Sequence, residues 1–94
     1  MPKPDREIIT LHPDGTQTRE RVSAKTEILP ILQAKGGGFI EPAGLLPATF
    51  EGRKAAIYVN EEGLLRGLPV NRWAWKLWGM HRVGPIVIDR PWKE

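Results

Sequence analysis

Glycine and proline interrupt this chain so often that only short helices and strands fit between them. The 94 residues include 10 glycines and 9 prolines, about a fifth of the total. They are spread between apolar segments and form no low-complexity tract, so they indicate turns. A chain of this length predicts a single domain over residues 1–94 with a small core, with flexible tails expected at 1–5 and 90–94.

The first half predicts a hairpin, a helix and a strand. Residues 7–12 and 16–22 are strand-like and flank the turn Pro13-Asp14-Gly15-Thr16. A helix should run from Thr26 or Glu27 to Lys35, where the glycine run 36–38 ends it. Pro30 fits only in the first helical turn, so the true start should be Glu27 or Ile28. Residues 39–41 then predict a short strand.

The second half predicts a loop, a second hairpin, a helix and a last strand. Residues 43–54 show no clear helical or strand periodicity of apolar residues, so they predict a loop. Residues 55–59 and 64–66 would form a hairpin about the turn 60–63, followed by a helix within 70–79 and a strand at 85–88. The fold class is therefore α+β, a small single domain with a mixed sheet and two short helices.

Charge and tryptophan both concentrate in the last third of the chain. Residues 1–63 hold 8 basic and 9 acidic side chains, whereas residues 64–94 hold 6 basic and 2 acidic, net +4, and all four tryptophans. The chain has no cysteine, which excludes disulfides, zinc fingers and iron–sulfur sites. Its short apolar runs predict a cytoplasmic protein without membrane contact.

The residues needed for catalysis are scarce. Nucleophilic catalysis requires a serine, cysteine or threonine beside a base, but Ser23 is the one serine, and His12 and His81 lie in unrelated segments. No histidines or carboxylates have metal-ligand spacing, and the glycine run follows a helix, whereas phosphate-binding glycines precede one. We expect no enzyme, no metal and no cofactor; an enzyme would need a base such as Asp89 or Glu41.

The predicted second helix carries the most informative pattern. One face presents a predicted core stripe of Val70, Trp73, Leu77 and Met80. Trp75 and Trp78 would lie on the outward face, beside a basic edge of Arg72 and Lys76. An exposed aromatic patch of this kind usually marks a binding site. Two alternatives stay open: the loop 43–54 could cover the patch, or a homo-oligomer interface could use it.

A nucleotide-like ligand requires a stacking ring, a guanidinium for phosphate and an amide to read the base. Trp75 and Trp78 could stack, Arg66, Arg72 and Arg82 could contact phosphate, and Asn60 or Asn71 could orient the ligand, with Asn71 also expected as helix N-cap. The candidate ligand-binding residues are therefore Asn60, Arg66, Asn71, Arg72, Trp75, Trp78 and Arg82.

Three segments carry a family resemblance. They are residues 37–41 (Gly-Gly-Phe-Ile-Glu), the block at 59–72 that contains Asn-Glu-Glu-Gly and Gly-Leu-Pro-Val-Asn-Arg, and the closing segment 83–88. Across roughly residues 26 to 89 the chain resembles the phage-associated domain-of-unknown-function family 3846. The tryptophan-rich helix and the stretch 78–82 depart from the family pattern. The resemblance implies a small phage protein in the host cytoplasm, of the kind that acts against bacterial defence.

The resulting hypothesis is a non-enzymatic binding protein, expected as a homo-oligomer, that sequesters an anionic nucleotide-derived molecule such as a bacterial immune signal. One alternative is a nucleic-acid-binding accessory protein, although a net charge of +4 is weak for that role. Another is an inhibitor that docks on a host enzyme through its tryptophans.

Overall fold

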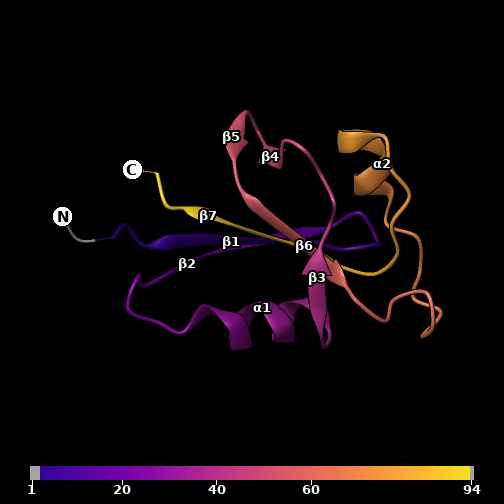
Figure 1. Ribbon diagram of the computed structural model, residues 1–94, viewed down its shortest axis with the longest axis horizontal. Coiled ribbons are helices and arrows are strands. Elements are labelled where there is room, and N and C mark those ends of the chain that lie inside the picture. The colour runs from indigo at the N-terminus through magenta and orange to yellow at the C-terminus, as the bar shows by residue number, and fades with distance from the viewer. Residues whose placement is uncertain (1–2, 94) are drawn as a thin grey trace.

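The computed structural model describes residues 3–93 as a five-stranded sheet with other elements packed on both of its faces (Figure 1). Its elements are β1 (Arg6–Leu11), β2 (Gln17–Val22), α1 (Ile28–Gly36), β3 (Ile40–Pro42), β4 (Thr49–Phe50), β5 (Arg53–Lys54), β6 (Ala56–Asn60), α2 (Arg72–Trp78) and β7 (Ile86–Pro91). The strand order is β2-β1-β7-β6-β3, and β4 and β5 form a separate pair. The predicted α+β class with two short helices is confirmed.

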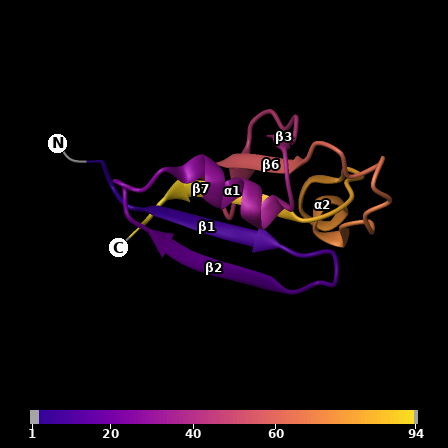
Figure 2. The same ribbon diagram turned by 90° about the horizontal axis from the view of Figure 1, so that it is seen from below.

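The sheet is antiparallel in every ladder between the described strands, so the prediction of a mixed sheet was wrong. Neighbouring parallel strands need a crossover connection, which is usually a helix. Here α1 leads from β2 to β3, which lie at opposite edges of the sheet. The helix therefore crosses one face of the sheet, as Figure 2 shows.

Local sequence signals predicted the first half well. In the turn between β1 and β2, the carboxylate of Asp14 accepts hydrogen bonds from the backbone N–H of Thr16 at 2.9 Å and from its hydroxyl at 2.6 Å. Helix α1 begins at Ile28, with Pro30 in its first turn as expected. It ends where Gly37 takes a left-handed conformation, with φ of 79°.

The second hairpin lies earlier in the chain than predicted. Residues 43–54, expected to be a loop, contain the antiparallel pair β4–β5. Residues 64–66, expected to be a strand, instead belong to consecutive turns in which the N–H of Arg66 donates to the carbonyl of Glu62 at 2.9 Å. Leu64 and Leu65 are 80% and 90% exposed, so no buried face exists to hold a strand there.

Helix α2 and strand β7 follow the prediction, with one correction at the end of the chain. Strand β7 continues through Pro91, so Arg90 and Pro91 belong to the sheet and not to a tail. Arg90 is buried, and Glu7 on the neighbouring strand compensates its charge at 2.7 Å. The rest of the expected tails includes residues 1–2 and 94, which lie outside the described residues.

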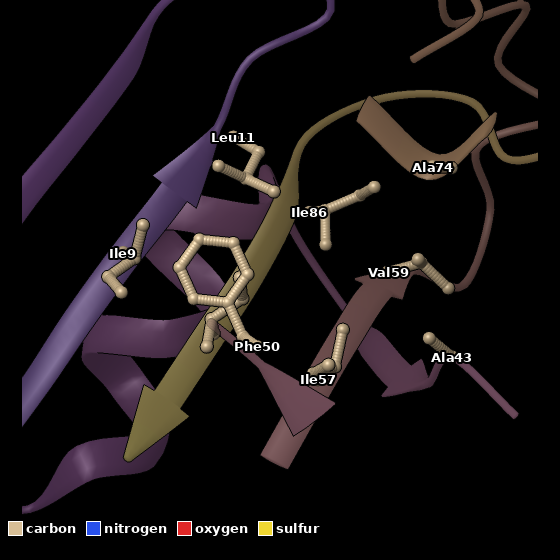
Figure 3. Packing of buried hydrophobic residues seen from close by; sticks show 9 residues of the cluster. Ile9, Leu11, Ala43, Phe50, Ile57, Val59, Ala74 and Ile86 are labelled. Atoms are coloured by element: carbon tan, nitrogen blue, oxygen red, sulfur yellow. The ribbon is translucent and has the colours of Figure 1, made fainter. Parts of the chain in front are cut away.

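Each face of the sheet has its own hydrophobic core, because successive strand residues point to opposite faces. Helix α1 covers a cluster of Ile8, Val22, Leu32 and Val87. On the other face, the β4–β5 hairpin and α2 cover the larger cluster (Figure 1), and Figure 3 shows its side chains. Its buried members are Ile9, Leu11, Ala43, Phe50, Ile57, Val59, Ala74, Ile86 and Ile88. Helix α2 is held against this face because its Ala74 packs in the larger cluster.

Neither helix within residues 3–93 has the length and apolar character needed to span a membrane.

Candidate functional site

Ala74 sets the orientation of α2. It is completely buried and packs in the cluster of Figure 3, whereas Arg72 and Lys76 are exposed. The predicted core stripe is therefore wrong in part, since Val70 and Leu77 are 51% and 41% exposed. Because α2 packs close to the sheet, the small residue Ala74 faces inward. A periodicity based on large apolar residues does not identify Ala74 as the buried position.

Trp78 does not share the outward face with Trp75. Its indole Nε1–H donates to the carbonyl of Thr49 at 2.9 Å, and its ring lies 6.3 Å from that of Phe50. The segment 43–54 thus covers Trp78, which was one of the alternatives left open by the sequence. Trp75 remains 73% exposed. The prediction that both rings face outward was therefore wrong for Trp78.

Trp75 forms part of a pocket of about 430 Å³, which we call the Trp75 pocket. Its lining residues are Val70, Asn71, Arg72, Trp75, Lys76, Met80 and His81. The lining is mainly apolar, and it includes two cations, Arg72 and Lys76. Pockets of this size and character commonly bind small molecules.

A smaller pocket of about 240 Å³, the Trp73 pocket, lies beside the same helix. It is lined by Gly15 from the β1–β2 turn and by Arg72, Trp73 and Lys76. The Nζ of Lys76 lies 5.6 Å from the centroid of the Trp73 ring. The buried Nε1–H of Trp73 has no acceptor among residues 3–93.

A third pocket, of about 400 Å³, adjoins the Trp75 pocket through His81, which lines both. It contains two predicted ligand residues, Asn60 and Arg82, together with Glu41, Glu61, Leu64, Leu65 and Val83. Its two carboxylates would repel an anionic ligand, so the Trp75 pocket is the better anion site.

The side chains of both candidate asparagines form hydrogen bonds with backbone groups. Asn71 is 1% exposed; its Nδ2 donates to the carbonyls of Leu11 and Gly84, both at 2.8 Å, and its Oδ1 accepts from the N–H of Trp73. Its predicted N-cap role is confirmed, and both amide hydrogens are engaged. Asn60 is 5% exposed and donates to the carbonyl of Gly36 at 2.8 Å. Both side chains therefore have structural roles.

Two of the candidate arginines contact other segments. Nη1 of Arg66 donates to the carbonyl of Gly37 at 2.7 Å, and Nη2 of Arg82 donates to the carbonyl of Ala43 at 2.8 Å. The seven candidate residues consequently do not form one site. Arg72, Trp75 and the backbone-bound Asn71 meet at the Trp75 pocket.

The site also contains Lys76, Val70, Met80 and His81, which were not among the candidate ligand residues. Lys76 had a sequence signal, because it lies four residues after Arg72 and so shares its helix face. The contributions of Met80 and His81 depend on how the chain turns back after Gly79.

The positive charge beside Trp75 is available to a ligand. On the sheet, arginines are neutralised by carboxylates, as in the pairs of Arg6 with Asp89 and Arg90 with Glu7, at 2.8 and 2.7 Å. Arg72 and Lys76, in contrast, have no carboxylate partner within the part of the chain that the structure describes. An anion bound there would not have to displace an internal ion pair.

No protein-family model, curated protein or solved structure matches the chain. The resemblance to family 3846 therefore stays a prediction. Residues 3–93 also contain no group of three or more histidine or carboxylate side chains that could hold a metal ion.

Proposed function

We propose that this protein is a non-enzymatic binding protein that captures a small anionic, nucleotide-derived molecule in the Trp75 pocket. The observation that carries the proposal is the exposed Trp75 indole beside Arg72 and Lys76, two cations without a carboxylate partner among the described residues. A nucleobase would stack on the indole, and a phosphate would lie against the cations. Val70 and Met80 would exclude water from the base.

Sequestration is the biological role that fits such binding in a small phage-type protein. The resemblance to family 3846 supports that context, and a bacterial immune signal is the ligand class that anti-defence action would require. Within this proposal the protein acts in the host cytoplasm and holds its ligand without converting it. A homo-oligomer is part of the proposal, and the mass of the protein in solution tests it.

Calorimetry against a panel of nucleotides tests the binding proposal. The panel contains mononucleotides, cyclic nucleotides, cyclic ADP-ribose and a single-stranded oligonucleotide. Stacking contributes about 1 to 3 kcal/mol per base, so Trp75→Ala should weaken binding at least about fivefold. Arg72→Ala should also weaken it. Phe39→Ala is the matched control, since Phe39 is an exposed aromatic, at 64%, directly before β3.

Each other outcome contradicts the proposal. No binding across the panel would overturn it. Tighter, strongly salt-dependent binding of the oligonucleotide would favour the nucleic-acid alternative. A host protein captured by the wild type and lost with Trp75→Ala, without any nucleotide binding, would favour the inhibitor alternative.

A further inference from the structure

Arg72 and Lys76 form a basic ridge between two pockets. Both side chains line the Trp75 pocket, and both also line the Trp73 pocket. One tryptophan and one concave surface therefore lie on each side of a shared pair of cations. The two pockets are neighbours along the outer surface of α2.

Helix geometry explains this arrangement. At about 100° per residue, Arg72 and Lys76 lie about 40° apart on the outward face, opposite the buried Ala74. Trp73 follows Arg72, and Trp75 precedes Lys76, so the two rings diverge by roughly 80° on either side of the ridge. The sequence Arg-Trp-Ala-Trp-Lys thus presents a near-symmetric surface.

Gly15 lines the Trp73 pocket on the side of the β1–β2 turn. A Cβ at this position would have no heavy atom within 4 Å, so the space around Gly15 is open. Its φ of 92° is in the range that favours glycine. A ligand group could enter there without displacing a side chain of the turn.

We infer that the ligand is a dinucleotide, with two ring-bearing halves joined by an anionic bridge. This inference rests on the proposed function and specifies its ligand class. The phosphate bridge would lie on the ridge of Arg72 and Lys76, one base would enter the Trp75 pocket, and the other would enter the Trp73 pocket. A mononucleotide would fill the Trp75 pocket and leave the Trp73 pocket empty.

Two probes separate this inference from the proposed function: adenosine monophosphate and the linear dinucleotide pApA, each measured by calorimetry. The dinucleotide should bind about fivefold more tightly or better, because a second base adds about 1 to 3 kcal/mol of stacking. Equal affinity for the two probes would overturn the dinucleotide inference and leave the proposed function in place. Absence of pApA binding would overturn the dinucleotide inference, whereas the proposed function is overturned only when the whole panel fails to bind.

Variants in the Trp73 pocket provide the second test. Gly15→Asn adds a side chain at a residue that lines the pocket, and asparagine tolerates positive φ better than most residues. It should lower the affinity for pApA to that for adenosine monophosphate, and it should leave the latter unchanged. Trp73→Phe keeps an aromatic ring and should cost pApA about threefold. An undiminished preference for pApA in both folded variants would overturn the inference.

Discussion

The indole Nε1–H of Trp78 donates to the carbonyl oxygen of Thr49 at 2.9 Å, and this bond fastens α2 to the β4–β5 hairpin. Trp73, five residues earlier in the same helix, has a buried Nε1–H without an acceptor among the described residues. Two tryptophans of one short helix thus differ in whether their polar atom is satisfied.

This contrast predicts different costs for the same substitution. Trp78→Phe removes the hydrogen bond to the Thr49 carbonyl, whereas Trp73→Phe removes a donor that has no acceptor within residues 3–93. We expect Trp78→Phe to lower the free energy of unfolding by about 1 to 2 kcal/mol more than Trp73→Phe. Urea denaturation of the two variants measures the difference. Equal costs would show that the bond to Thr49 contributes nothing.

The carboxylate of Glu51 makes the stability of the folded protein depend on pH. This carboxylate accepts two hydrogen bonds from Arg19, at 3.0 and 2.9 Å, and one from Arg90 at 2.9 Å. These arginines lower the pKa of Glu51 from 4.5 to about 2, the hydrogen bonds from Arg19 contributing most. Because the folded-state pKa is lowered, the stabilisation is present above pH 4.5 and is lost as the pH falls toward 2.

Glu51→Gln tests this linkage. The side chain is 48% exposed, so solvent screening leaves about 1 kcal/mol of stabilisation at neutral pH. The wild type should exceed the variant by that amount at pH 7, and the difference should shrink between pH 4.5 and 2. Thermal unfolding over this range gives the measurement. A difference that does not change with pH would contradict the role of the Glu51 charge.

Asn71→Ala should be among the most destabilising changes in the α2 region. It removes the helix N-cap and leaves the carbonyls of Leu11 and Gly84 unpaired in a buried environment. We expect a loss of about 2 to 4 kcal/mol in the free energy of unfolding. Arg72→Ala, at the next residue, is the control, because Arg72 is exposed and should cost within about 0.5 kcal/mol. A similar, small loss in both variants would refute the structural role of Asn71.

Elements with strong local signals could be predicted from the sequence. The turn at Asp14 and Gly15, the helix stop at Gly37 and the N-cap at Asn71 each depend on residues within a few positions of one another. The β4–β5 hairpin has no comparable signal. Glu51 in its turn is bound by Arg19 and Arg90, which are distant in sequence.

For the candidate site, the sequence by itself determined that Arg72 and Lys76 share one helix face and that tryptophans lie beside them, because helical spacing is a local property. Only the tertiary structure decided which tryptophan is available to a ligand. The second covered face of the sheet places Ala74 inward and Trp78 against Thr49, which leaves Trp75 exposed. Packing between segments that are distant in sequence determines which tryptophan is exposed, because burial depends on the whole fold.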